Sequence, residues 1–290
     1  MEFRNILHAV LPLCIPIAIL GLAVRVAWKD VAAALKQRRG IVSVCILCFV
    51  VQPLVAIAFC KLLSPNRLIE AIVLVAAIAP GDPFVVLEAE HRKGSVPLAI
   101  ALTTILSVVM PLSLFVWMPM AFRLFGGAVP ISDSGAFLDV LKLVVPFILG
   151  GVLLRTLLPK VAEAIAGPLK ILSMIAYLFV GVVFVILGLR YLIDYSVMTA
   201  LTILAVTSIS LVVGYFCSGF STERGRRTGA LVVALGNYIV VAYIALEAYH
   251  LPIERFCAAI AVVIVMRLLA IIVWNAIAKR STADAAAEAA

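Results

Sequence analysis

The chain has 290 residues, of which 65% are hydrophobic and only 13% are charged, and its formal net charge is +8. Soluble domains are about 45–50% apolar and about 25% charged, and disordered chains need the opposite composition. The sequence therefore excludes a water-soluble two-domain enzyme and a disordered chain. In so apolar a chain, the excess of Lys and Arg indicates orientation in a membrane rather than binding to nucleic acid.

Long apolar runs follow one another along the chain, separated by short polar connections. A helix needs about 20 such residues to cross a membrane. The runs predict an all-α polytopic membrane protein with about nine transmembrane helices, over residues 7–28, 41–63, 68–91, 95–120, 137–158, 169–192, 198–217, 228–250 and 253–278. Residues 1–280 are expected to form a single membrane domain, followed by a disordered tail over residues 281–290.

The basic residues predict which side of the membrane each connection faces. The loops and helix ends of one side carry 14 Lys and Arg residues, and those of the other side carry seven. Because connections rich in Lys and Arg stay in the cytoplasm, the N-terminus is expected outside and the C-terminus inside. The sequence thus predicts a multi-pass protein of the plasma (inner) membrane.

Two of the nine predicted helices are interrupted. The helix over 68–91 contains Pro80-Gly81-Asp82-Pro83, and the helix over 228–250 contains Gly236-Asn237. Proline lacks the backbone donor and clashes with the preceding turn of a helix. Irregular backbone inside a membrane persists only where protein or a wet cavity satisfies its polar groups. Both helices are therefore expected to be broken at these positions.

The two breaks also predict an internal repeat. Each lies in the third of four consecutive helices, which gives a repeat over 7–120 and a second over 137–278 that has one extra leading helix. The offset of five helices is odd, so the two repeats are expected to have opposite orientations in the membrane. Paired broken helices in inverted repeats are typical of the binding site of secondary transporters.

Two charged residues inside the predicted helices are candidates for function. Asp82 either carries a proton during transport or caps the half-helix that begins at Pro83. Arg267 lies near the middle of the last helix, where an unpaired charge costs about 2.5 kcal/mol or more. It either pairs with an acid such as Asp82 or faces a cavity and receives an anionic substrate. The second interpretation is favoured, because a guanidinium group is well shaped for anions.

Three other polar residues are candidate substrate contacts. Thr103 belongs to the helix over 95–120, where its hydroxyl either contacts a ligand or packs against another helix. Asn237 and Tyr238 either contact substrate or satisfy the backbone groups that the second break leaves free. Glu88 and Arg92 are four residues apart and are expected to form a surface ion pair. No histidine has a partner at metal-ligand spacing, so no metal site is predicted.

Several motifs are shared with one family of transporters. They are Asp30 after the first helix, Pro53 in the second, AIVLVAAIAPGDP at the first break, the turn Lys93-Gly94-Ser95, the run VPLAIALTTILSVVMPL and, more weakly, RRTGALVVALGNYIVVAYIAL at the second break. In these motifs the chain resembles the bile acid:sodium symporter family. The resemblance implies a panel formed by helices 1, 5 and 6. It also implies a core of helices 2–4 and 7–9, whose broken helices cross near the midplane of the membrane.

The resemblance also indicates where sodium would bind. At eight positions the family has side chains that bind sodium. In this chain only Thr103 and Asn237 have a side-chain oxygen at such a position. The other six positions hold residues without one: Cys48, Val85, Val86, Ala99, Val232 and Gly236. A hard cation needs several oxygen ligands to offset its lost hydration. The sequence therefore argues against sodium coupling, and Asp82 and Thr103 are the candidate ion-coupling residues.

Together these features predict a secondary transporter that moves a small organic anion by alternating access. The alternatives are a proton-coupled or uncoupled carrier of organic acids and, from another class, a non-transporting membrane sensor. An enzyme is not expected, because neither His-Glu-x-x-His nor Gly-x-Ser-x-Gly occurs. No cofactor is expected, and no Gly-x-x-x-x-Gly-Lys loop indicates the use of ATP.

Overall fold

The computed structural model describes the chain except for residues 1, 30, 31, 33–35, 64–66, 126–134, 249–252, 289 and 290. The described residues form helices, and their one β-bridge is isolated. In chain order the elements are α1 (Glu2–Ala23), α3 (Arg38–Ile46), the π-helical turn η1 (Leu47–Val51), α4 (Gln52–Leu63), α5 (Arg67–Ile78), α6 (Phe84–His91), α7 (Val96–Phe125), α8 (Gly135–Leu157), α9 (Pro159–Gly188), the 3-10 turn η2 (Leu189–Asp194), α10 (Val197–Cys217), α11 (Glu223–Ala234), α12 (Tyr238–Ala248) and α13 (Ile253–Glu288). The predicted all-α class is confirmed.

Five stretches of the described helices are long and apolar enough to cross a membrane. They are Arg38–Leu63, Val96–Trp117, Pro159–Tyr191, Val197–Cys217 and Cys257–Ala276, and two shorter apolar helices are Val10–Ala23 and Leu68–Ile78. The prediction of nine transmembrane helices stays a prediction. The predicted helices over 68–91 and 228–250 are each divided into two short helices, α5 with α6 and α11 with α12, so neither forms one continuous span.

The helix over 41–63 is continuous but irregular just before its proline. Pro53 has no N–H to donate to the carbonyl of Phe49 four residues earlier, and the chain forms the π-helical turn η1 there. The Phe49 oxygen instead accepts a hydrogen bond of 2.7 Å from the indole N–H of Trp117 in α7. A distant side chain thus satisfies a backbone group that has no water to bind inside a membrane.

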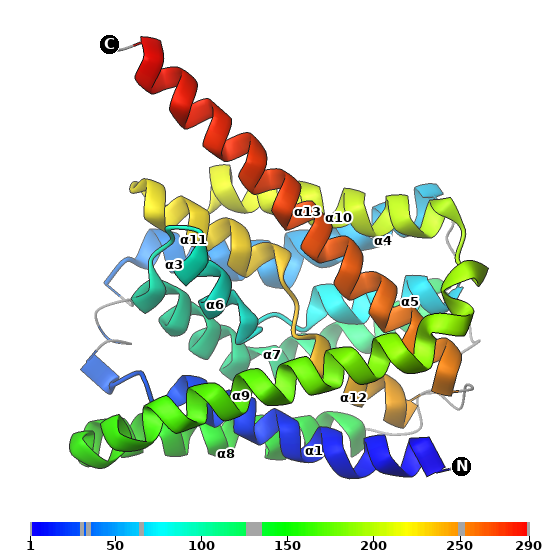
Figure 1. Ribbon diagram of the computed structural model, residues 1–290, viewed down its shortest axis with the longest axis horizontal. Helices are drawn as coiled ribbons and strands as arrows, with labels where there is room; N and C mark the ends of the chain where they lie inside the picture. The colour runs from blue at the N-terminus through cyan, green and yellow to red at the C-terminus, as the bar shows by residue number, and fades with distance from the viewer. Residues whose placement is uncertain are drawn as a thin grey trace.

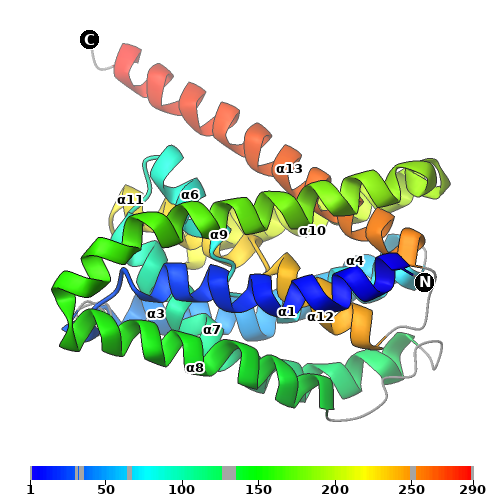
Figure 2. The ribbon, with the colours of Figure 1, turned by 60° about the horizontal axis from the view of Figure 1, so that its bottom comes forward.

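Three helices pack together along one side of the molecule. α1 contacts both α8 and α9 along its length, and α8 contacts α9. Figure 2 shows α1 between α8 and α9, with α1 and α8 running one way along the molecule and α9 running the opposite way. They correspond to predicted helices 1, 5 and 6, so the packing agrees with the panel that the resemblance implies.

The two breaks meet near the middle of the molecule (Figure 1). α5 ends at Ile78 and α6 begins at Phe84, while α11 ends at Ala234 and α12 begins at Tyr238, so both predicted breaks are confirmed. Pro80 and Gly236 form an antiparallel bridge, and the Asn237 N–H donates to the Ala79 oxygen over 2.7 Å. Each extended link therefore satisfies part of the backbone of the other.

Glycine is required at both crossing links. Gly81 has a φ of +93°, which L side chains rarely adopt. A Cβ atom on Gly236 would lie 1.9 Å from the backbone oxygen of Ala76. Gly236 can therefore approach the last turn of α5 only because it has no side chain.

The end of the chain differs from its prediction. Residues 281–290 were expected to be a disordered tail, but α13 continues to Glu288, and Figure 1 shows it extending beyond the other helices. The segment is rich in alanine, the best helix former, so a helix that has already begun can continue through it.

Candidate functional site

A cavity of about 560 Å³ lies beside the crossing of the two links. Its walls come from α6, α9, α12 and α13 and from the links themselves, so residues far apart in the sequence contribute to it. Most of the lining is apolar, and the polar exceptions include Asp82, Tyr238 and Arg267. The structure thus brings together three of the five predicted site residues.

Asp82 closes the first break and faces this cavity. It is 1% exposed, and its Oδ1 accepts a hydrogen bond of 2.8 Å from the Phe84 N–H at the start of α6. This bond satisfies one of the free N–H groups at a helix N-terminus. The predicted capping role is confirmed, and it leaves the carboxylate on the cavity wall.

Arg267 reaches the same cavity from α13. It is 6% exposed, and its one hydrogen bond to the described residues runs from Nη1 to the Gly236 oxygen over 3.4 Å. A guanidinium group has five N–H donors, so most of them remain available to a ligand. Asp82 and Arg267 interact electrostatically but form no direct ion pair within the described structure.

Tyr238 and Asn237 begin α12 and have different surroundings. The Tyr238 hydroxyl donates to the backbone oxygen of Tyr177 over 3.1 Å, and the two rings meet edge to face with centroids 5.2 Å apart. Asn237 is not part of the cavity wall; its Oδ1 accepts from the Val240 N–H over 3.2 Å and caps α12. The structure therefore gives Asn237 a role in the break and leaves Tyr238 at the cavity.

Thr103 lies outside the cavity, buried in α7. Its hydroxyl has no hydrogen-bond partner among the described residues. The neighbouring hydroxyls do have partners, since Thr104 donates to the Ile100 oxygen over 2.8 Å and Ser107 donates to the Gly81 oxygen over 3.1 Å. Ser107 thus supports the first link directly, whereas nothing in the described structure places Thr103 against Asp82.

Five of the six positions that lack the family's sodium-binding side chains gather in one apolar cluster. Cys48, Val85, Val86, Ala99 and Val232 are at most 2% exposed and belong to one packed hydrophobic cluster. Among these five described residues, the one side-chain hydrogen bond runs from Cys48 Sγ to the backbone oxygen of Val232 over 3.9 Å. In the described part of the chain, no group of three or more His, Cys, Asp or Glu residues could hold a metal ion.

Sequence reasoning missed the contribution of α9. Tyr177 is 6% exposed and lines the cavity beside Asp82. Gly181 lines the same wall one turn later. α9 is not broken, so nothing local distinguishes these residues; only a polar tyrosine in an otherwise apolar run could have indicated them.

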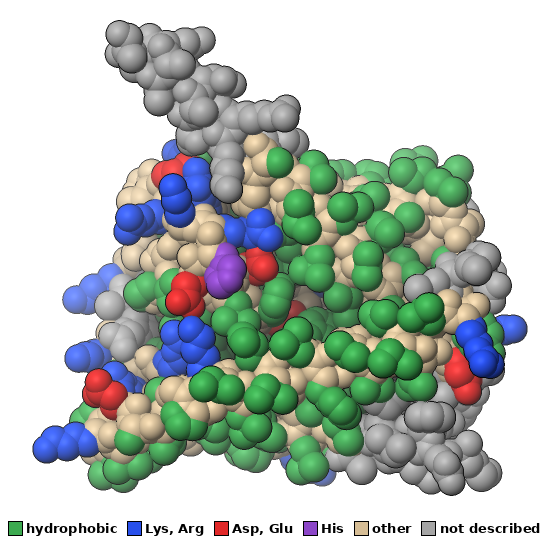
Figure 3. All heavy atoms as spheres, in the orientation of Figure 1, with side chains coloured by type: hydrophobic (Ala, Val, Ile, Leu, Met, Phe, Trp, Pro, Cys, Tyr) green, Lys and Arg blue, Asp and Glu red, His purple; other side chains and the backbone are tan. Residues whose placement is uncertain are grey.

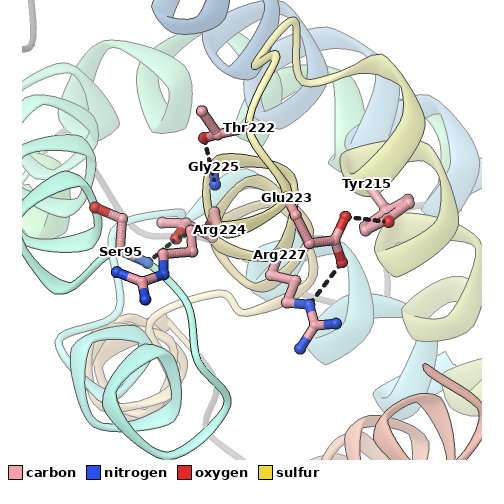
Figure 4. A network of polar contacts seen from close by, with 8 residues as sticks. Ser95, Tyr215, Thr222, Glu223, Arg224, Gly225 and Arg227 are labelled. Carbon is pink, nitrogen blue, oxygen red and sulfur yellow. Dashed lines mark hydrogen bonds and ion pairs between the residues drawn. The ribbon is translucent and has the colours of Figure 1, made fainter. Parts of the chain in front are cut away.

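A network of hydrogen bonds connects the start of α11 to α10 and to the turn after α6 (Figure 4). Glu223, at the start of α11, accepts hydrogen bonds from the Tyr215 hydroxyl over 2.6 Å and from Arg227 Nε over 2.7 Å. Partial burial raises the pKa of the Glu223 carboxyl, but the hydrogen bonds from Tyr215 and Arg227 lower this pKa by more than burial raises it. The pKa of Glu223 therefore lies below its usual value. The Ser95 N–H, after α6, donates to the Thr228 hydroxyl in α11 over 2.8 Å.

The predicted pair of Glu88 and Arg92 also forms at this end of the molecule. Arg92 makes a second contact, from Nη1 to the Ile271 oxygen of α13 over 3.4 Å. Since Glu88 lines the cavity, the pair lies at its edge rather than on a remote surface. Arg92 thereby joins the end of α6 to the middle of α13 beside the cavity.

Comparison with known proteins identifies the family of the chain. The family model described as Sodium Bile acid symporter family matches residues 12–195, which include the second half of α1, the first break and the α9 wall of the cavity. Asn237, Tyr238 and Arg267 lie beyond the matched residues. Among curated proteins, none matches the sequence significantly. With its apolar helices and this match, the chain is a multi-pass membrane protein that belongs to the Sodium Bile acid symporter family.

Proposed function

We propose that the protein is a secondary transporter that binds a small organic anion in the cavity beside the crossing and moves it by alternating access. The observation that carries the proposal is the position of Arg267, a buried cation on an apolar cavity wall with most of its donors unpartnered. An ionisable side chain at membrane depth is costly and is usually retained for function. A planar guanidinium binds a carboxylate through two parallel hydrogen bonds.

The rest of the cavity suits the body of such a ligand. A volume of about 560 Å³ falls within the range of roughly 300–1,000 Å³ that is usual for small-molecule sites. The lining beyond the polar residues is apolar, so a hydrocarbon portion would be buried favourably. Tyr177 and Tyr238 add hydroxyl and ring surfaces near Asp82 for orienting the ligand.

The proposal includes nine spans in two inverted repeats, with the N-terminus outside. It is supported by the meeting of the two breaks through the Pro80–Gly236 bridge and by the separate packing of α1, α8 and α9. Figure 3 supports the orientation, because most of the Lys and Arg side chains in view lie at the end of the molecule that holds α3, α6 and α11. Basic residues favour the cytoplasmic side.

We further propose that sodium does not drive transport. Sodium would have to replace its hydration shell with oxygen ligands, and the positions in question form the apolar cluster around Cys48, Val85 and Val232. A proton carried by Asp82 is the alternative source of coupling, because its carboxylate lies on the same cavity wall as Arg267. An uncoupled carrier would need neither ion.

Thermal unfolding of the detergent-purified protein with a panel of organic acids tests both proposals. At 100 times its dissociation constant, an acid that binds only the folded state should add about 2.7 kcal/mol of stability. We expect the same stabilisation in sodium chloride and in choline chloride. Stabilisation that requires sodium would contradict the sodium-independent mechanism, and stabilisation by no acid would contradict the anion site. Uptake into vesicles separates a transporter from a sensor, which binds without moving its ligand.

Substitution of Asp82 separates its capping role from its proposed role as a proton carrier. Asp82→Asn keeps an oxygen that can accept from the Phe84 N–H, so the unfolding temperature should stay near that of the parent. Asp82→Ala removes the cap and should lower stability by about 1 kcal/mol. If Asp82 carries the proton, uptake in either variant should lose its dependence on external pH. Full pH dependence in Asp82→Asn would rule out the carrier role.

A further inference from the structure

The cavity beside the crossing contains two buried groups of opposite charge. Asp82 and Arg267 are 1% and 6% exposed, and both line the cavity. They interact electrostatically but form no direct ion pair in the described part of the chain. Each of the two charged groups is therefore able to bind a ligand group of the opposite sign.

The hydrogen bonds printed on these two side chains involve neutral groups. Asp82 accepts from the Phe84 N–H over 2.8 Å, and the neutral side chain of Tyr177 lies beside it. Among the described residues, Arg267 donates to the backbone oxygen of Gly236 over 3.4 Å. Neutral partners satisfy single hydrogen bonds, but a buried charge is fully compensated only by an opposite charge. A carboxylate has about four lone-pair sites, so Asp82 can keep its cap and still bind a cation.

The other ionisable groups of the lining do not disturb this balance of charge. Glu88 and His91 line the cavity further along α6. Glu88 is paired with Arg92, and His91 is exposed. A ligand with a carboxylate alone would therefore add an uncompensated negative charge to a cavity that already holds Asp82. A ligand that has both a carboxylate and an ammonium group would compensate both buried charges.

Both charges lie at the crossing of the two links. Arg267 binds the oxygen of Gly236, and Gly236 forms the bridge with Pro80, which is two residues before Asp82. The α9 wall beyond the crossing is apolar and is lined by Leu178, Gly181, Val182, Val185 and Ile186. The arrangement thus suits a ligand that has its two charged groups at one end and hydrocarbon at the other.

We propose that the ligand is an apolar α-amino acid, bound as a zwitterion. Its carboxylate binds Arg267, its ammonium group binds Asp82, and its hydrocarbon side chain lies against α9. The inference rests on the proposed function, because it takes Arg267 as the residue that binds the acidic group. It adds a second charged group to the ligand and gives Asp82 a direct contact with it.

Four compounds with six carbon atoms test this proposal. Hexanoate has the acidic group alone, hexylamine has the ammonium group alone, 2-aminohexanoate has both at one end, and 6-aminohexanoate has them at opposite ends. The affinity of the full chain for each is measured in detergent, from the dependence of the unfolding temperature on ligand concentration. We expect 2-aminohexanoate to bind about 10- to 100-fold more tightly than hexanoate, because it gains a hydrogen bond between charged groups. It should also bind more tightly than the other two compounds.

Two variants assign the charged groups of the ligand to their partners. Asp82→Asn keeps an oxygen for the cap but loses the charge, so 2-aminohexanoate should lose its advantage over hexanoate, while the affinity for hexanoate should not fall. Arg267→Gln should weaken the binding of both compounds. Glu90→Gln is the matched control, because Glu90 is an exposed acid of α6 that binds Lys170 and does not line the cavity. Its affinities should equal those of the parent chain.

Three results would overturn the proposal. Binding of 2-aminohexanoate no tighter than that of hexanoate would show that the site does not use an ammonium group. An undiminished preference in Asp82→Asn would show that Asp82 is not its partner. Tightest binding of 6-aminohexanoate would show that the two charges are not received at one end of the cavity. In each case, hexanoate that still binds through Arg267 leaves the proposed anion carrier intact, whereas the failure of every acid contradicts the proposed function itself.

Discussion

Replacing Arg267 with glutamine should reduce the affinity for a bound organic acid by about 10- to 100-fold, since a hydrogen bond to a charged group contributes about 1.5–3 kcal/mol. Glutamine keeps much of the length of the side chain but loses the charge and the paired donors. Arg267→Lys keeps the charge without the planar pair of donors, so its loss should be smaller. The affinity is measured from the dependence of the unfolding temperature on acid concentration and from saturation of uptake.

Arg255→Gln is the control for this experiment. Arg255 lies on the same helix as Arg267, but its side chain is exposed and does not line the cavity. We expect its affinity to match that of the parent chain. An Arg267→Gln protein that folds and binds the acid as tightly as the parent would show that the anion site lies elsewhere, whatever the control does.

Replacing Gly236 with alanine should give the largest loss of stability, about 3 kcal/mol, the upper part of the usual range for overpacking. The added Cβ would lie 1.9 Å from the backbone oxygen of Ala76 and 3.2 Å from Arg267 Nη1. Relief requires the second link to move away from the last turn of α5, and this would strain the Pro80–Gly236 bridge and the bond from Asn237 to Ala79. Thermal unfolding in detergent measures the loss, and uptake in vesicles should fall with it.

Gly150→Ala is the matched control on α8, where an added Cβ meets no atom within 4 Å. Alanine is favoured over glycine inside a helix by roughly 0.5–1 kcal/mol, so this variant should be as stable as the parent or slightly more stable. Equal unfolding temperatures for Gly236→Ala and the parent would mean that Gly236 lies further from Ala76 than the structure shows.

The breaks could be predicted because their cause is local. Pro80 and Pro83 lack the donors of a helix and clash with its preceding turn, and the structure ends α5 and begins α6 around them. The cap by Asp82 is equally local, since its acceptor and the Phe84 donor are two residues apart. In contrast, residues 281–288 are helical although their composition is small and polar, because alanine favours helix.

The candidate site could be predicted only in part. Asp82, Tyr238 and Arg267 were selected by their charge or by their place at a break, and all three line the cavity. Thr103 and Asn237 were selected on similar grounds, but they lie outside the cavity wall, one in the packed interior of α7 and one capping α12. Residue type alone does not distinguish a ligand-facing polar group from one that satisfies the fold.

The sequence by itself determined that the chain is an apolar helical membrane protein, where two of its helices break, and which family it resembles, because run lengths, prolines and local motifs carry that information. Only the tertiary structure decided that the breaks pair through Ala79 and Asn237 and that α9 supplies Tyr177 and Gly181 to the wall facing Arg267. These relations join residues that are distant in the chain. They depend on how closely whole helices pack, and no local pattern specifies that.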